Sequence, residues 1–135
     1  MSATTTTVPP AGERHVPFLV LLGARRQHAE GGEAEVVIEL KPELLNNHGG
    51  GHGGVVMTLL DNAMANAALS RIGFTREVVT IDMHVAFMRA ATGQISARAR
   101  TSGGGKSVCF CEAEARDADG ELVARAMGTF RYRSP

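Results

Sequence analysis

A glycine-rich loop that runs directly into a long apolar segment constrains the fold of this chain more than any other feature. Residues 46–54 read NNHGGGHGG, and residues 55–72 contain neither proline nor glycine. On a helix, these residues would place apolar side chains around most of the circumference, as in a helix that is buried on nearly all sides. Several are alanines, which keep a helix thin and let a sheet approach it closely. The sequence therefore predicts one long central helix over residues 53–72.

The segments on either side of this helix read as strands. Apolar and polar residues alternate in them, and glycine-rich or Asp-Gly turns separate most of them. In the third strand, Val79, Ile81 and Met83 alternate with polar residues and are expected to share one face. A short capped helix over residues 17–23, two strands, the buried helix and four strands indicate an α+β fold with an antiparallel sheet. The predicted strands cover residues 24–28, 34–40, 79–88, 94–101, 106–116 and 121–133.

The length and composition fit one folded unit. A chain of 135 residues can bury one core, and we expect a single domain over residues 17–135. Residues 1–16 are rich in threonine, proline and glycine, lack the apolar core of a secretory signal, and are expected to be a disordered tail. No apolar run reaches the roughly 20 residues that a membrane-spanning helix needs. Because one helix can cover only one face of the sheet, we expect a homo-oligomer.

Charge and cysteine content restrict the partners and the compartment. The chain has 14 basic and 14 acidic residues, and aromatic residues make up 4% of it. It therefore lacks the basic field and the stacking surfaces that bind nucleic acid. Cys109 and Cys111 would face the same side of a strand, a poor arrangement for a disulfide, and are expected to be buried free thiols. Free thiols are typical of a reducing compartment, so we expect a cytoplasmic protein. With the charge balance and the absence of a long apolar run, we expect it to bind neither nucleic acid nor a membrane.

The start of the predicted helix combines two groups that suit hydrolysis. Exposed N–H groups at a helix N-terminus stabilise negative charge, and glycines without Cβ let a carbonyl oxygen approach them. Asp61 follows within two helical turns, where apolar surroundings disfavour its charged form and raise its basicity. An oxyanion site near Gly53 and a nearby carboxylate predict a hydrolase. Asp61 would act as general base toward water or as the nucleophile, and the residues alone leave both open.

The two histidines of the loop allow a second interpretation. His48 and His52 form a His-x3-His pair, and Asp61 or His84 would serve as a further ligand of a zinc site. The three glycines between the histidines hold such a pair only loosely, so we expect neither a metal nor another cofactor. His52 instead is expected to orient the loop or to donate a hydrogen bond to a substrate carbonyl.

Several motifs in this order resemble the hotdog-fold acyl-CoA thioesterases. Asn46, His52-Gly53-Gly54 and Asp61 are followed by TIDM at residues 80–83 and by GKS at residues 105–107. The particular likeness is to the phenylacetate-degradation (PaaI-type) branch, and it covers residues 17–132. The resemblance implies a six-stranded antiparallel sheet wrapped around the helix, in a dimer that commonly pairs into a tetramer. It also implies active sites at the dimer interface. The loop over residues 47–51 departs from the family in being unusually small and glycine-rich.

The resemblance also implies roles for individual residues. Asp61 would be the base or nucleophile, and the Gly53 N–H would hold the thioester oxygen. Asn46 would position the attacking water or carboxylate, and Thr80, from the neighbouring subunit, would orient water. His52 would support the carbonyl-binding loop.

The family likeness further indicates where the substrate would bind. Gly54 and His48 are expected beside the carbonyl. The Gly105-Lys106-Ser107 turn would meet the coenzyme A phosphates, with Arg89 or an arginine of the last strand as helper. The acyl group stays open between aryl-acetyl and medium-chain, because methionines adapt to either and are equally ordinary core residues. These methionines are Met57, Met64, Met83 and Met88.

Two other functions share much of this pattern. A hotdog hydratase or dehydratase would need an acid/base histidine against the carboxylate, which His48 or His52 with Asp61 could imitate. A non-catalytic acyl-CoA-binding protein would bind the ester without cleaving it. Release of a free thiol distinguishes the thioesterase from both.

Overall fold

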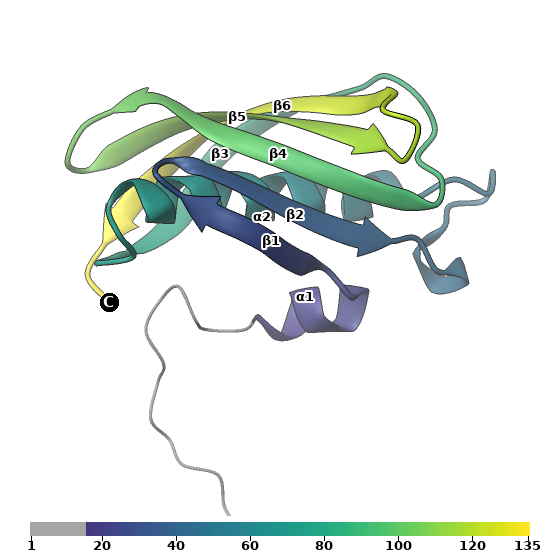
Figure 1. Ribbon diagram of the computed structural model, residues 1–135, viewed down its shortest axis with the longest axis horizontal. Coiled ribbons are helices and arrows are strands. Elements are labelled where there is room, and N and C mark those ends of the chain that lie inside the picture. The colour runs from purple at the N-terminus through teal and green to yellow at the C-terminus, as the bar shows by residue number, and fades with distance from the viewer. Residues whose placement is uncertain (1–15) are drawn as a thin grey trace, which may run out of the picture.

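Residues 16–135, which the computed structural model describes, form a curled sheet around a long helix (Figure 1). All neighbouring strands are antiparallel, in the spatial order β1-β2-β4-β5-β6-β3. This confirms the predicted α+β architecture. The tail predicted over residues 1–16 lies, except for Val16, outside the described residues. The elements are α1 (Pro17–Leu22), β1 (Arg25–Glu30), β2 (Glu33–Glu39), η2 (Pro42–Leu44), α2 (Gly53–Arg71), β3 (Glu77–Phe87), β4 (Gln94–Gly104), β5 (Val108–Asp117) and β6 (Leu122–Arg133).

Small side chains build the contact between α2 and the sheet. Ala63, Ala67 and Ala68 of α2 are completely buried. Because an alanine carries no atom beyond Cβ, the backbones of helix and strands can approach closely, and the sheet can curl around the helix axis. Larger side chains such as Leu60 and Phe130 fill the space beside this contact. The inner face of β4, β5 and β6 is likewise rich in alanine, at Ala97, Ala99, Ala113, Ala115, Ala124 and Ala126.

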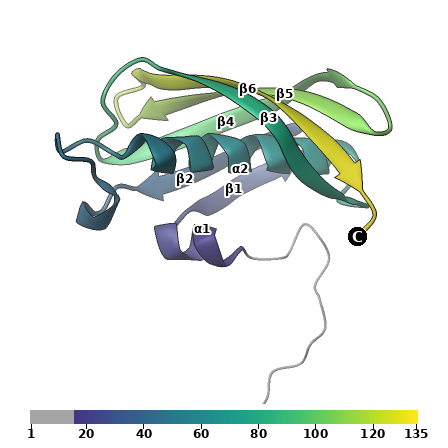
Figure 2. The same cartoon turned by 180° about the vertical axis from the view of Figure 1, so that it is seen from behind.

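One side of α2 stays outside this wrapping. Figure 2 shows the helix lying along the concave face of the sheet, with β1 and β2 on one side and β3 on the other. Gly54 and Met57 are exposed on it, and Thr58 and Asp61 are half-buried. These four residues lie at helical spacing on one face. The helix is therefore buried over most of its circumference, as predicted, but it keeps an open stripe that contains the carboxylate.

Strand β3 changes the face that its side chains occupy. Ile81 has no partner on β6, whose residues pair with the positions on either side of it, and it forms a β-bulge. The bulge lets both Thr80 and Met83 face α2, although residues of opposite parity face opposite sides of a regular strand. Val79 and Ile81 are 39% and 53% exposed. The prediction that these apolar residues share one face with Met83 is therefore wrong, because the bulge interrupts the alternation.

The two edge strands of the sheet differ in chemistry. Strand β1 reads RRQHAE and has an irregular register with β2, two features that oppose pairing with another chain. Strand β3 offers an edge of 11 residues with exposed Val79 and Ile81. A long apolar edge is a template for pairing with a further strand. Of the two, β3 is the edge that suits the expected homo-oligomer.

Smaller features also follow the sequence. Helix α1 begins with a proline and ends at Gly23, whose φ of 78° is left-handed. Cys109 and Cys111 are buried free thiols, as predicted. Within residues 16–135, no helix has both the length and the apolar character needed to cross a membrane.

The turn between β4 and β5 gives a test of this geometry. Gly104 has a φ of +133°, and a Cβ there would lie 2.4 Å from the Val108 carbonyl oxygen, whereas a Cβ on Gly105 would meet no atom within 4 Å. Gly104→Ala is expected to lower the free energy of unfolding by about 2 kcal/mol or more through backbone strain and overlap. Gly105→Ala, the matched control, should change it by less than about 0.5 kcal/mol. Urea denaturation measures both, and equal midpoints would contradict the geometry of this turn.

Candidate active site

Asp61 and Thr80 form the centre of the candidate site. The Thr80 hydroxyl donates a hydrogen bond to Asp61 Oδ1 at 2.6 Å, joining the middle of α2 to β3 just before the bulge. Burial raises the pKa of Asp61 above its usual range, and the Thr80 hydrogen bond partly opposes that effect. A carboxylate with a raised pKa is a stronger base than an ordinary one. The expectation placed Thr80 on a neighbouring subunit, but the structure brings it to Asp61 of its own chain.

This pair opens into an apolar hollow. Its volume is about 360 Å3, and Asp61 contributes the one ionisable group among its lining side chains. The Thr58 hydroxyl already donates to the Gly54 carbonyl oxygen at 2.8 Å. Of the four methionines named from the sequence, Met57 and Met83 line the hollow, while Met64 is buried in the core. The carboxylate thus faces a space suited to an uncharged group. The hollow is lined by Gly54, Met57, Thr58, Asp61, Thr80 and Met83.

The N-terminus of α2 is capped by His52. Its Nδ1 accepts a hydrogen bond from the Gly54 N–H at 2.9 Å. The N–H groups of Val55 and Val56 both donate to the His52 carbonyl oxygen. Across residues 16–135 no acceptor is found for the Gly53 N–H, so this donor of the first turn is available to a ligand. His52, which was expected to orient the loop or to contact a substrate carbonyl, is the N-terminal cap of α2 in the structure.

The cap explains the two glycines that follow His52. A Cβ on Gly54 would lie 3.1 Å from His52 Nδ1, a contact tight enough that the imidazole would have to shift by a few tenths of an ångström. A Cβ on Gly53 would meet the Phe87 ring at 3.5 Å, an ordinary contact. Packing against the cap therefore favours glycine at position 54 more than at position 53. The absence of a Cβ was expected to matter in the same way at both glycines, and the structure gives it a packing consequence at Gly54 that it does not have at Gly53.

The loop ahead of the helix is organised by Asn46. Its Oδ1 accepts from the N–H groups of His48 at 2.8 Å and Gly50 at 3.2 Å, and its own N–H donates to the Gly50 carbonyl oxygen. The carboxamide oxygen is thus occupied by the turn, which leaves the Nδ2 amide as the group able to donate to a ligand. His48 is exposed and enters this network through its backbone.

Gly53 and Asp61 do not share one site within the chain. They are eight positions apart on α2, which corresponds to about 12 Å along the helix axis. A single carbonyl group cannot lie within hydrogen-bond distance of the Gly53 N–H and also meet the Asp61 carboxylate at that separation. The two groups were expected to act together because they lie about two helical turns apart, but two turns correspond to about 12 Å.

The turn that follows β4 lies at the opposite end of α2 from Gly53. The Arg71 guanidinium donates to the Gly105 carbonyl oxygen at 3.2 Å, and Arg76 donates to that of Lys106 at 2.7 Å. No motif in the sequence marks these two arginines, because their proximity to the turn depends on the tertiary fold. Ser107 is exposed in this turn, and its carbonyl oxygen accepts from the backbone of β6.

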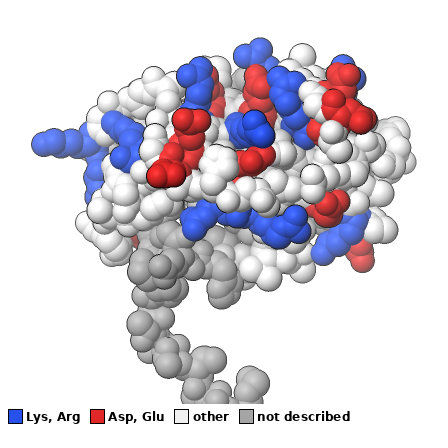
Figure 3. Space-filling view, in the orientation of Figure 1, with Lys and Arg blue, Asp and Glu red and all other residues white. Residues whose placement is uncertain are grey.

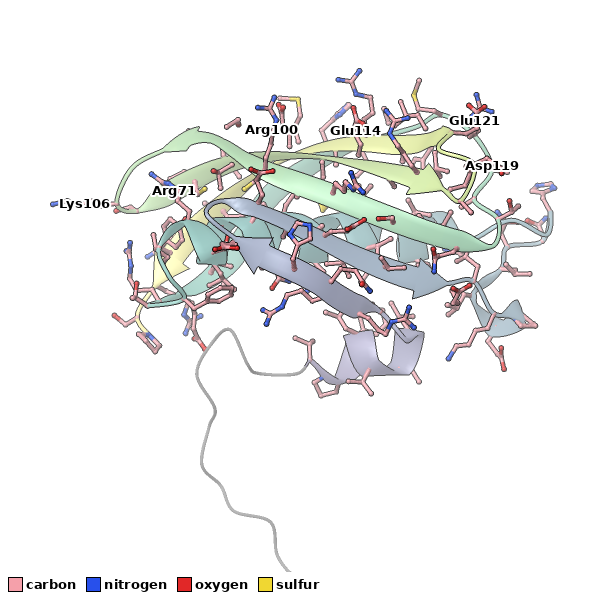
Figure 4. All side chains as sticks on the ribbon, in the orientation of Figure 1. Arg71, Arg100, Lys106, Glu114, Asp119 and Glu121 are labelled. Atoms are coloured by element: carbon pink, nitrogen blue, oxygen red, sulfur yellow. The ribbon has the colours of Figure 1, made fainter. Side chains whose placement is uncertain are left out.

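Arg89 is not brought to this turn. It follows β3 at the end that faces Ala124, and it forms an ion pair of 3.5 Å with Glu121. The turn precedes Val108, which faces Arg131. Seven residues of β6 therefore separate the two places, about 23 Å. Figure 4 shows Lys106 and Glu121 at opposite ends of the molecule.

The histidines and carboxylates do not assemble into a metal centre in the part of the chain that the structure describes. No cluster of three or more histidine, cysteine, aspartate or glutamate side chains there could hold an ion. His84 lies on the outer face of the sheet, in a second hollow away from α2, whereas Asp61 lies on the inner side.

Similarity to known proteins shows the family of this chain. A family model described as the thioesterase superfamily matches residues 48–124. The chain belongs to this superfamily. A protein of Halobacterium salinarum that carries an esterase name is 34% identical over 84% of this chain and 83% of its own length. The superfamily and this relative support thioester hydrolysis in general terms.

Solved structures confirm the hotdog arrangement of the helix and sheet. The conserved protein PA5202 from Pseudomonas aeruginosa is 32% identical, with a TM-score of 0.86, over 93% of this chain and all of that one. A variant of the phenylacetic acid degradation protein PaaI from Thermus thermophilus is 30% identical, with a TM-score of 0.78, over 86% of this chain and 98% of that one.

The raised pKa of Asp61 predicts a pH-dependent cost to stability. Below about pH 3.8 this carboxyl is protonated in both the folded and the unfolded chain, whereas at neutral pH the folded chain must bury part of a charge. The Asp61→Asn variant should therefore gain stability over the wild type as the pH rises from 3.5 to 7. In the Thr80→Val background the gain should be larger, because the hydrogen bond that opposes burial is gone. Urea unfolding at several pH values measures it, and a gain that is constant with pH would contradict the assignment.

Proposed function

We propose that this chain is an acyl-CoA thioesterase that hydrolyses a thioester to a free acid and coenzyme A. The observation that carries the proposal is the Asp61 carboxylate, which burial makes more basic and Thr80 holds at 2.6 Å beside an apolar hollow. The thiolate of coenzyme A is a good leaving group, so the site does not need a strong general acid. Membership of the thioesterase superfamily supports the same reaction class.

The separation of Gly53 from Asp61 leads us to propose a site shared by two copies. In a two-fold symmetric pair of antiparallel helices, position 53 of one copy lies opposite position 61 of the other when the axis passes near Met57. Met57 is 39% exposed in the middle of the open stripe of α2. The β3 edges of the two copies would pair across the same axis. Each dimer would then hold two sites, each with Asp61 and Thr80 from one copy and the Gly53 N–H from its partner.

The proposed reaction uses these groups in one order. The thioester carbonyl oxygen accepts the Gly53 N–H at the positive end of α2, which stabilises the oxyanion as it forms. Asp61 takes a proton from a water molecule held by Thr80 and that water attacks the carbonyl carbon, or Asp61 attacks the carbon itself. The carbon–sulfur bond breaks and the electron pair leaves on the thiolate. In the second case this leaves an anhydride on Asp61, which a water molecule then hydrolyses to the free acid. Asn46 would donate through Nδ2 to the attacking group, and His52 would keep the helix terminus in place.

The remaining expected contacts are part of this proposal. Gly54 and the His48 loop would border the carbonyl, and Met57 and Met83 would meet an uncharged acyl group. The Gly105-Lys106-Ser107 turn would meet the phosphates of coenzyme A. Arg89 lies at the Gly53 end of its own chain, so it would reach a substrate bound at the partner's Asp61.

The first test is release of free thiol from a panel of acyl-CoA esters with aliphatic chains of increasing length and with aryl-acetyl groups. Wild-type protein should release thiol from esters with uncharged acyl groups. Asp61→Asn keeps the shape of the side chain and should lower kcat/KM by a hundredfold or more, because it removes the base. Hydration of an enoyl-CoA without thiol release, or full activity of Asp61→Asn, would contradict the proposal.

The shared site is tested with two inactive variants produced together. Proline is tolerated at the first position of a helix and after a residue with the backbone angles of His52, so Gly53→Pro removes the N–H while keeping the helix. Alone, it should lose a hundredfold or more of activity, whereas Gly53→Ala, which keeps the N–H, should stay within a few-fold. Coexpression of Gly53→Pro with Asp61→Asn should restore about a quarter of wild-type activity, since half of randomly formed dimers carry one intact site. A site within one chain would restore none.

A further inference from the structure

Three basic side chains gather where α2 ends. Arg71 is in the last turn of α2, Arg76 lies just before β3, and Lys106 is at the tip of the turn between β4 and β5. Figure 4 shows Arg71 and Lys106 at the same end of the molecule, and Figure 3 shows basic side chains projecting there. Among residues 16–135, none of the three forms an ion pair with a carboxylate. Their positive charges are therefore not neutralised within the described part of the chain.

Tyr132 fixes the two arginines. Its hydroxyl donates to the Ala68 carbonyl oxygen at 2.6 Å, and its N–H donates to that of Ser107 at 2.9 Å, so it joins α2 to the turn. The Arg76 guanidinium lies 4.7 Å from the centre of its ring and that of Arg71 6.0 Å. Burial raises the pKa of Tyr132 to about 12, which keeps the ring neutral beneath both cations.

The hydrogen bonds of the two guanidiniums leave donors available. Arg71 uses Nη1 toward the Gly105 carbonyl oxygen and the Tyr132 hydroxyl, and Arg76 uses Nη1 toward the Lys106 carbonyl oxygen. A guanidinium has five N–H donors in a planar fork, and the unused ones can bind two oxygens of one phosphate. Cation–π contacts and hydrogen bonds to carbonyl oxygens hold both guanidiniums before any ligand arrives, which reduces the entropy that binding would cost.

The distance from this cluster to Asp61 matches one part of the proposed substrate. Arg71 lies ten positions after Asp61 on α2, about 15 Å along the helix. Arg76 lies four positions before Thr80, about 13 Å along an extended chain. The arm of coenzyme A between sulfur and the first phosphorus has about thirteen bonds, equal to roughly four residues of extended backbone or about 15 Å. Along both α2 and β3, the basic cluster therefore lies about the length of one such arm from the Asp61–Thr80 pair.

We infer that Arg71 and Arg76, held on Tyr132, bind the phosphate groups at the nucleotide end of the thioester substrate, beside Lys106. This inference rests on the proposed function and deepens it. It makes the site selective for a thiol that carries phosphates about 15 Å from the sulfur over a short thiol that carries none.

The test compares one acyl group on two thiols, coenzyme A and the phosphate-free N-acetylcysteamine. The variant Arg71→Gln/Arg76→Gln should raise KM for the coenzyme A ester tenfold or more, with kcat nearly unchanged, because it removes charge-assisted hydrogen bonds remote from the reacting carbon. KM for the N-acetylcysteamine ester should not move. The matched control is Arg98→Gln, which removes one arginine from the outer face of the sheet and should leave both values unchanged. Equal effects on the two esters, or none on the coenzyme A ester, would overturn the inference.

A binding measurement separates this inference from the proposed reaction. Adenosine 3′,5′-bisphosphate carries the phosphates without a thioester, so calorimetry detects its binding even if no ester is hydrolysed. The wild type and Asp61→Asn should bind it equally, with affinity that falls as salt rises, and the double arginine variant should bind at least tenfold more weakly. Equal binding by the wild type and the arginine variant would overturn the phosphate site whatever the outcome for hydrolysis. Binding without hydrolysis would leave the site and remove the proposed function.

Discussion

The close contact between the alanines of α2 and those of the sheet is the constraint on which the rest of this structure depends. A helix can lie inside a curled sheet only if the two backbones come close together, and side chains without atoms beyond Cβ allow this on both surfaces. Because the sheet closes around most of α2 but not all of it, one stripe stays open beside β3. That stripe contains Asp61, and its partial burial is what raises the pKa of the carboxyl. The chemistry of the site thus follows from how far the sheet wraps.

The elements of the fold could be predicted because their signals are local. The uninterrupted apolar segment identified α2, and the alternating segments identified the strands to within a few residues. Which side chains of β3 point toward α2 could not be predicted, because the bulge at Ile81 is set by pairing with β6, a strand about fifty positions later. The same bulge turns Thr80 toward Asp61, so the hydrogen bond at the centre of the site depends on a break in the pattern that identified the strand. Arg71 and Arg76 were missed for a related reason, because only the tertiary fold brings them to the turn at Lys106.

The two glycines of the motif His52-Gly53-Gly54 differ in their hydrogen bonding. The imidazole accepts the Gly54 N–H and packs tightly against that glycine, which leaves the Gly53 N–H without an acceptor among residues 16–135. A helix terminus with one unoccupied N–H offers an oxyanion a defined position rather than a general positive region. The eight positions between Gly53 and Asp61 on α2, about 12 Å, prevent that position from serving the carboxylate of the same chain. Symmetry between two copies resolves this conflict without any change in the fold of either.

The direction of α2 also explains why the proposed substrate needs arginines at its far end. A helix has partial positive charge at its N-terminus and partial negative charge at its C-terminus. The N-terminus suits a developing oxyanion. The C-terminus would repel the phosphate groups of coenzyme A, which lie about 15 Å from the sulfur. Arg71 in the last turn interacts favourably with that negative end, and with Arg76 and Lys106 it reverses the sign of the local charge. Tyr132 allows the two arginines to lie close together, because a neutral ring beneath both guanidiniums offsets part of their mutual repulsion. The basic cluster thus offsets the negative end of α2 as well as the charge of the phosphate groups on the proposed substrate.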